Sequence, residues 1–332
     1  MKSIAKWAQR EREILFRNTA EKCGLSEGIV EKDFWVCWIL DYLFHDSPWR
    51  NHLAFKGGTS LSKCYKGIIK RFSEDVDVIL DWRLLGYDCE GPWAERSKTQ
   101  QAKFTREANT QTEVFLFGKF LPKLNCDFKK MLTEDFSLYI DRSDAQTVCF
   151  SYPRLFKENT LIHVVRLEIG VLAAWTPACM LSVKPYTADF YPRLHTTPST
   201  KVLTVSAERT FWEKVTILHK EAFREKGRFP LRYSRHYYDL YCMSSSSIKS
   251  HAFADLELLQ KVVDFKSRFY ASNSARYDVA TPRTMRLLPN AKYYLDLRRD
   301  YTSMQNMIFG DSPSFESLLD SLRKLEQEIN AL

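Results

Sequence analysis

The feature that most constrains this chain is a pair of motifs that follow one another between residues 55 and 80. The first is Phe55-Lys-Gly-Gly-Thr-Ser-Leu-Ser-Lys63, and the second is Arg71-Phe-Ser-Glu-Asp-Val-Asp-Val-Ile-Leu80. We predict a strand at 52–55, a helix at 59–69 and a second strand at 75–80. Two glycines at a strand-to-helix turn allow backbone N–H groups to approach a phosphate, with the Thr59 and Ser60 hydroxyls as further donors.

The second motif places two carboxylates on one strand face, because side chains alternate along a strand and Asp75 and Asp77 are two residues apart. Such carboxylates repel each other unless a proton or a cation bridges them, and oxygen ligands of this kind suit Mg²⁺ or Mn²⁺. Either motif alone more often marks an ordinary turn or a solvated strand end. Together they have the layout of a polymerase-β-like nucleotidyltransferase core.

That layout requires a third carboxylate on a neighbouring strand, and Glu168 in the predicted strand 163–169 is the candidate. Glu168 shares a strand face with Arg166. An ordinary exposed strand glutamate explains the position equally well. A restriction-type nuclease would need Glu-x-Lys here, whereas Ile169-Gly170 follows Glu168.

A second cluster lies in the predicted helix Ser206-Ala-Glu-Arg-Thr-Phe-Trp-Glu-Lys-Val-Thr-Ile-Leu-His219, capped by Ser206. Lys214 borders the apolar stripe of this helix, so it either extends to solvent past the core or binds a triphosphate. Further on, Arg235 and Asp239 are one helical turn apart, and an i,i+4 ion pair is the simplest interpretation.

The distribution of charge indicates which class of molecule this protein binds. The 332 residues carry 49 basic and 41 acidic side chains, and the basic excess concentrates in residues 56–71 (Lys66 among them) and 209–236. A polyanionic partner, nucleotide or nucleic acid, is therefore plausible. The second basic segment contains four tyrosines that could stack on RNA bases, although tyrosines at helical spacing are more often core: Tyr233, Tyr237, Tyr238 and Tyr241.

No apolar run is long enough to cross a bilayer, and the first residues are charged too early for a secretory signal. The eight cysteines include no CxxC pair or zinc spacing, which is typical of thiols in a reducing compartment. We therefore expect a cytoplasmic protein without membrane contact.

The remaining pattern predicts an α+β protein. Helices are expected at 6–20, from Ser26 through Ile39, and over 98–131. Strands are expected at 137–140, 147–152 and 180–186. Beyond Ser206 the chain is expected to be almost entirely helical, which suggests a core at 1–200 and a helical C-terminal domain at 201–332.

Three strings together resemble the AbiEii/AbiGii family of nucleotidyltransferase toxins, which includes the MenT toxins: the GGTSLSK…RFSEDVDV motif, the AERTFWEKVTILH helix and the SRHYYDLY segment. Glu31-Lys-Asp-Phe-Trp35 extends the resemblance toward the N-terminus. The resemblance implies a polymerase-β-like nucleotidyltransferase core with a mixed sheet and a helical C-terminal part. The interval of about 17 residues between Gly58 and Asp75 predicts a long helix after the glycines.

The family also implies roles for individual residues. Asp75, Asp77 and Glu168 would bind two Mg²⁺ (or Mn²⁺) ions, and Asp75, Asp77, Lys214 and Asp239 would be catalytic. The NTP would be bound by the glycine turn and by basic and hydroxyl side chains: Gly57, Gly58, Thr59, Ser60, Lys63, Ser73, Lys214 and Arg235.

By the same resemblance, the protein is the toxin of a toxin–antitoxin or phage-abortive system with a possible antitoxin partner. It would transfer NMP from an NTP to an acceptor hydroxyl, the 3′ end of tRNA being the first candidate. The alternatives are NMP transfer to a protein hydroxyl and a catalytically silent NTP- or antitoxin-binding module.

Overall fold

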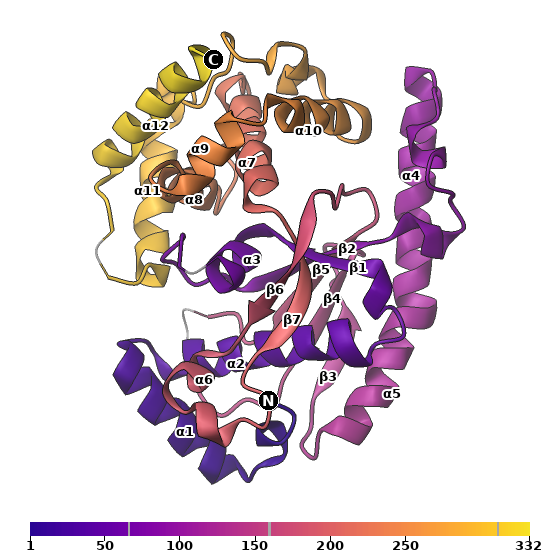
Figure 1. Ribbon diagram of the computed structural model, residues 1–332, viewed down its shortest axis with the longest axis vertical. Helices are drawn as coiled ribbons and strands as arrows, with labels where there is room; N and C mark the ends of the chain where they lie inside the picture. The colour runs from indigo at the N-terminus through magenta and orange to yellow at the C-terminus, as the bar shows by residue number, and fades with distance from the viewer. Residues whose placement is uncertain (66, 159–160, 311) are drawn as a thin grey trace. The chain divides into compact units, whose positions relative to one another are not determined.

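The computed structural model describes residues 1–65, 67–158, 161–310 and 312–332, and the chain forms two compact units (Figure 1). Unit 1 comprises Met1–Cys64 and Ser73–Thr204, and unit 2 comprises Tyr65–Phe72 and Val205–Leu332. The fold is α+β, as predicted. The predicted domains 1–200 and 201–332 stay a prediction. No local pattern indicated that residues 65–72 group with the C-terminal unit.

Within the described residues of unit 1, seven strands form one mixed sheet in the order β3-β4-β5-β2-β1-β7-β6. Their bounds are β1 Leu53–Lys56, β2 Asp75–Leu80, β3 Ser137–Ile140, β4 Thr147–Ser151, β5 Val165–Gly170, β6 Ala178–Val183 and β7 Thr200–Val205. Strand β2 is central: it pairs antiparallel with β1 and parallel with β5. The strand that carries the Asp-x-Asp motif is therefore fixed on both edges.

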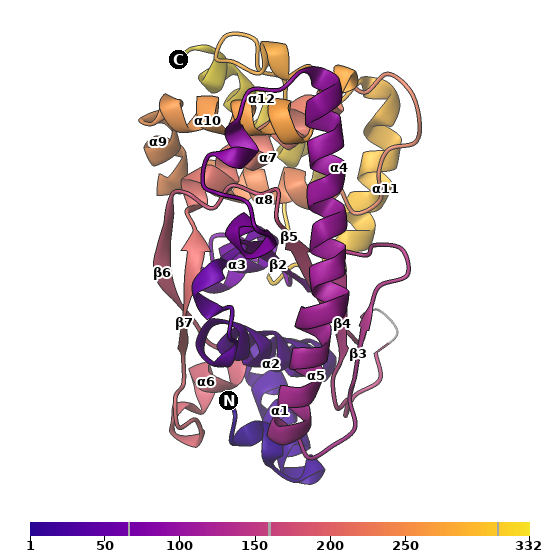
Figure 2. The ribbon, with the colours of Figure 1, turned by 90° about the vertical axis from the view of Figure 1, so that its right-hand side faces the viewer.

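The helices of unit 1 are α1 (Gln9–Cys23), α2 (Glu27–Asp41), α3 (Gly57–Cys64), α4 (Lys98–Phe115), α5 (Leu121–Met131) and the short α6 (Tyr186–Phe190). Ser26 caps α2 as predicted, since its hydroxyl accepts the Ile29 N–H at 3.3 Å. A π-turn joins α4 to α5, so the two run as one long rod (Figure 2).

An aromatic cluster forms the core between α2, α5 and the sheet. Trp35 and Trp38 of α2 pack on Phe150 of β4, and Phe128 of α5 contacts both Trp38 and Phe150 with ring centroids 4.7 and 5.2 Å apart. The Trp35, Trp38, Phe128 and Phe150 side chains are almost fully buried. Burial of rings of this size stabilises the layer of α2 against the sheet by several kcal/mol in total, at roughly 1.5–3 kcal/mol for each large side chain.

In the described residues of unit 2, the regular secondary structure is helical apart from one isolated bridge, between Arg71 and Ile308. Its helices are α7 (Ala207–Ala222), α8 (Ser234–Ser244), α9 (Ser247–Phe253), α10 (Leu256–Phe269), α11 (Tyr294–Met304) and α12 (Phe315–Asn330). Residues 70–72 join this unit through a two-sided contact: Phe72 N–H donates to Met307 O, and Phe309 N–H donates to Lys70 O, both at 2.7 Å. None of the helices in the described part of the chain has the length and apolar character that crossing a bilayer requires.

Two expectations about elements were wrong. The predicted long helix after the glycines ends at Cys64, because the chain leaves unit 1 there and residues 65–72 pack in unit 2. Strand β7 was not predicted, although Thr200-Lys-Val-Leu-Thr-Val205 alternates and is rich in β-branched residues. The Pro-rich stretch before it obscured that signal. The other predicted helices and strands are present, and their ends either coincide with the predicted ones or are shifted by up to three residues.

Candidate active site

The carboxylates of the Asp-x-Asp motif lie on one face of the sheet beside Glu168. In the parallel register of β2 and β5, Asp75 is opposite Arg166 and Asp77 is opposite Glu168. The burial of β5 alternates, with Val165, Leu167 and Ile169 buried and the intervening residues partly exposed. The sheet thus presents three carboxylates on one face, as the strand periodicity predicts.

The glycine turn lies directly against this face. Gly57 begins α3 with φ of +82°, a left-handed conformation that disfavours any side chain. A β-carbon at residue 57 would lie 1.9 Å from Asp77 Oδ2, which is a severe clash. The glycine is therefore required twice, for its backbone conformation and for the space that the Asp77 carboxylate occupies.

The hydroxyls of the same turn are engaged with the backbone. The Thr59 hydroxyl donates to the Asp75 carbonyl oxygen, and the Ser60 hydroxyl donates to the Gly57 carbonyl oxygen at 2.9 Å. The groups of α3 suited to a phosphate are then the N–H groups of its first turn, which have no acceptor within a helix. The expected contacts of Gly57, Gly58, Thr59 and Ser60 with a nucleotide stay a prediction.

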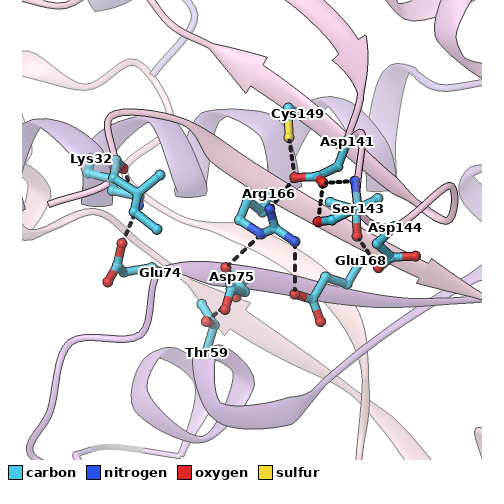
Figure 3. Close-up of polar contacts among 12 residues, drawn as sticks. Lys32, Thr59, Glu74, Asp75, Asp141, Ser143, Asp144, Cys149, Arg166 and Glu168 are labelled. Carbon is cyan, nitrogen blue, oxygen red and sulfur yellow. Dashed lines mark hydrogen bonds and ion pairs between the residues drawn. The ribbon is translucent and has the colours of Figure 1, made fainter. Parts of the chain in front are cut away.

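The Arg166 side chain lies among the carboxylates. The Arg166 guanidinium forms a close ion pair with Asp141, and lies 3.6 Å from Asp75 Oδ1 and 3.8 Å from Glu168 Oε1 (Figure 3). Asp141 follows β3 in the β3–β4 turn. Hydrogen bonds from Ser143 and the charge of Arg166 hold the pKa of the Asp141 carboxyl well below its ordinary range. Strand alternation predicted Arg166 on this face, without a role for it.

The donor set fits a divalent metal in its chemistry and in its location on one strand face. Asp75, Asp77 and Glu168 supply only carboxylate oxygens, as Mg²⁺ and Mn²⁺ prefer, and Gly57 keeps the space beside Asp77 clear of a β-carbon. Within the described residues, however, no three acidic, His or Cys side chains converge closely enough to form a ready metal cluster. Binding would require the carboxylates to draw together.

Buried ion pairs anchor the residues around this face. Lys32 of α2 donates to Glu74 Oε2 at 2.8 Å and to the Ile162 carbonyl at 2.6 Å, immediately beside Asp75 in the chain (Figure 3). Lys63 pairs with Asp33 at 2.5 Å and is only 6% exposed. This burial favours a structural role for Lys63, and its expected contact with a nucleotide stays a prediction. Ser73 is mostly buried two residues before Asp75.

Unit 2 contains its own buried charge cluster. Asp239 of α8 accepts two hydrogen bonds from Arg71, at 2.6 and 2.8 Å, and its Oδ2 lies 2.7 Å from Lys214 Nζ of α7. The three side chains are at most 6% exposed. Its position on the helix allowed Lys214 to extend past the core to solvent. The burial of its side chain rules that interpretation out. The spacing of α8 predicted an ion pair between Asp239 and Arg235. In the structure, Arg71 and Lys214, which are distant in sequence, bind the Asp239 carboxylate.

Electrostatics favour the ionised form of Asp239. Burial alone would raise the pKa of Asp239, but the adjacent Arg71 and Lys214 charges outweigh it and hold the pKa well below its usual range. Burial lowers the pKa of Lys214, and the charge of Asp239 offsets only part of that shift. Two cations thus share one carboxylate, which leaves the cluster with an excess of positive charge.

Two of the four tyrosines proposed for RNA stacking are in the core. Tyr237 is fully buried and Tyr238 is 2% exposed, so that part of the interpretation was wrong. Tyrosines at helical spacing are more often part of the core, and both of these lie on the inner face of α8. Tyr233 and Tyr241 are partly exposed. Lys66, from the first basic segment, lies outside the described residues.

Comparison with known protein families gives a match over residues 38–321, to the family described as nucleotidyl transferase AbiEii toxin, type IV toxin–antitoxin system. The chain belongs to the AbiEii toxin family. The match spans most of both units and includes every predicted site residue, so the resemblance seen in the motifs is confirmed. This family match supports a role as a toxin nucleotidyltransferase.

Among solved structures, the chain is similar to MenT4, the nucleotidyltransferase toxin Rv2826c from Mycobacterium tuberculosis H37Rv. The TM-score is 0.54 at 17% identity, covering 96% of this chain and 90% of that one. Two Helicobacter pylori structures, JHP933 and a putative nucleotidyltransferase, each give a TM-score of 0.45 at 15% identity. Both cover 92% of this chain, and 94% and 96% of their own. Comparison with curated protein sequences gives no match.

Proposed function

We propose that this AbiEii-family protein transfers a nucleoside monophosphate from an NTP to an acceptor hydroxyl, the 3′ end of tRNA being the acceptor. The observation that supports this most is the register of β2 and β5, in which Asp77 faces Glu168 while Asp75 shares their face beside the Gly57 turn. Carboxylates beside a phosphate-suited helix start are what nucleotidyl transfer requires.

In this proposal Asp75, Asp77 and Glu168 hold Mg²⁺ or Mn²⁺. The bound metal would lower the pKa of the acceptor hydroxyl and offset the charge of the triphosphate. The first-turn N–H groups of α3 bind phosphate oxygens and orient the α-phosphorus toward the acceptor. The acceptor oxygen forms a bond to that phosphorus, the α–β phosphate bond breaks, and pyrophosphate leaves.

Lys214 and Asp239 act as a unit in the proposal. Lys214 contributes positive charge toward the nucleotide. Asp239 forms ion pairs with both Arg71 and Lys214, and so fixes the position of the Lys214 ammonium. Asp239 is then essential through the position it gives Lys214. Arg235, one turn from Asp239 on α8, is proposed to contribute a further cation toward the nucleotide.

The family description names a toxin–antitoxin system, and we propose an antitoxin protein as a partner of this chain. The basic segment 209–236, with eight basic residues against three acidic ones, supports an RNA acceptor. Because the charge of an RNA backbone would be matched over several residues, RNA binding should weaken strongly as salt rises.

The test is incubation of the purified protein with each α-³²P-labelled NTP, Mg²⁺ and either total RNA or RNase-treated cell extract. Label on RNA of tRNA size, removed by 3′ exonuclease digestion, supports the proposal. Label on protein would establish the alternative of NMP transfer to a protein hydroxyl. Absence of label on either, with NTP binding retained, would show a catalytically silent binding module.

A further inference from the structure

Charged side chains on the partly exposed strand face form two rows. One row runs from Lys56 of β1 through Asp77 of β2 to Glu168 of β5, and the other brings Asp75 of β2 beside Arg166 of β5. Arg166 lies 3.6 Å from Asp75 Oδ1 and 3.8 Å from Glu168 Oε1, two of the three candidate metal ligands. These separations are longer than a charge-assisted hydrogen bond, so Arg166 is near both carboxylates without closing on either.

Asp141 keeps the guanidinium in this intermediate position. Its carboxylate accepts hydrogen bonds from the Ser143 N–H at 2.8 Å and the Ser143 hydroxyl at 2.6 Å, and it forms the close ion pair with Arg166 (Figure 3). Cys149 of β4 also contacts Asp141, with Sγ 3.7 Å from Oδ2. Asp141 is therefore fixed by the turn that carries it, and it pulls Arg166 away from Asp75 and Glu168.

We propose that Arg166 is a positioning residue of the metal site, a built-in counter-cation that Asp141 holds at a distance where it competes with a divalent metal without blocking it. The inference rests on the proposed function, because it assumes that Asp75, Asp77 and Glu168 are the metal ligands. In the metal-free protein, the Arg166 charge reduces the repulsion among the three carboxylates.

A fixed positive charge beside the ligands weakens metal binding, because two cations at short distance repel each other. A triphosphate brings several negative charges and offsets that repulsion. Metal and NTP should consequently bind with positive coupling, each raising the affinity for the other by the same factor. Arg166 thereby weakens the binding of a metal to the carboxylates when no nucleotide is present.

The test is direct measurement of Mn²⁺ affinity, by the loss of the free-ion EPR signal, in wild type and variants without nucleotide. Arg166→Met should bind Mn²⁺ about tenfold or more tightly, because the competing charge is gone. Asp141→Asn should bind it about threefold or more weakly, because Arg166 is released toward Asp75 and Glu168. Arg166→Lys, which keeps the charge, should stay close to wild type.

The same titration with a non-hydrolysable NTP analogue measures the coupling. The analogue should raise Mn²⁺ affinity about tenfold more in wild type than in Arg166→Met, since the variant lacks the Arg166 charge that the analogue offsets. Arg142→Met, which removes an exposed arginine next to Asp141, is the matched control and should leave both affinities unchanged. Thermal melting establishes that each variant is folded.

Two results would overturn the inference, and they are distinguishable. If Asp77→Asn abolishes Mn²⁺ binding while the Arg166 and Asp141 variants match wild type, the metal ligands stand and Arg166 has no positioning role. If wild type and all variants fail to bind Mn²⁺, with or without the analogue, the proposed metal site is wrong and the role of Arg166 falls with it.

Discussion

Asp77 and Gly57 are in such close contact that a β-carbon on residue 57 would lie 1.9 Å from the Asp77 carboxylate. The two motifs that the sequence shows as separate strings are therefore one structural feature. The glycine of the first motif makes room for the carboxylate of the second, and its φ of +82° turns the chain from β1 into α3.

Gly57→Ala tests this contact. The alanine β-carbon must displace Asp77 or the start of α3, and the left-handed backbone adds about 1–2 kcal/mol of strain. We expect label transfer to fall by at least about tenfold, the effect of roughly 1.4 kcal/mol. Gly86→Ala is the control, because Gly86 also has a positive φ of +87° but nothing lies within 4 Å of its added β-carbon. Equal transfer by the two variants would contradict the account.

Lys214→Met tests the charge cluster of unit 2. Removal of a charge-assisted contact worth about 1.5–3 kcal/mol predicts a roughly 10- to 150-fold loss of transfer, largely as weaker NTP binding. The variant should fold, because Arg71 still pairs with Asp239 through two hydrogen bonds. Lys220→Met, on the partly exposed side of α7, should be nearly normal. Nearly normal transfer by both variants would rule out a nucleotide role for Lys214.

Elements with a strong local pattern could be predicted from the sequence. Strand β2 begins at Asp75 and ends at Leu80 as predicted, because alternation of charged and apolar residues is a local signal. The partners of Asp239 were not predictable, since Arg71 is 168 residues away in the chain and only tertiary packing brings them together. The i,i+4 rule could suggest only Arg235.

The position of Arg166 could be predicted from the sequence only in part. Its position two residues before Glu168 places both on one strand face, which the alternation already shows. Its contact with Asp141, which lies 25 residues earlier in a turn, depends on the β4–β5 and β3–β4 registers. Pairing registers across separate strands are not encoded in the spacing of one segment.

Glu31 gives a pH-dependent prediction. Burial raises the pKa of Glu31 to about 7, and hydrogen bonds from the Leu155 and Phe156 N–H groups offset only part of the shift. The folded state thus binds a proton that the unfolded chain releases near its ordinary pKa of about 4.3. The resulting stability is present below that pH and is lost as pH rises through about 7.

The measurement is thermal melting of wild type and Glu31→Gln from pH 4 to 8. The glutamine cannot ionise, so wild type should lose up to about 3 kcal/mol of unfolding free energy relative to the variant across this window. Glu21→Gln, an exposed position on α1, is the control and should show no such divergence. Parallel curves for wild type and Glu31→Gln would contradict the shifted pKa.

The assignment of the Asp77 strand face as the active site is tested by transfer of label from α-³²P-NTP to RNA, measured for wild type and for Asp77→Asn. The substitution keeps the shape of the side chain and removes one of the three carboxylates proposed to bind the metal. We predict that the rate falls at least about a hundredfold while the melting temperature stays close to that of wild type. A folded Asp77→Asn protein that transfers label at nearly the wild-type rate would contradict the assignment of this strand face as the active site.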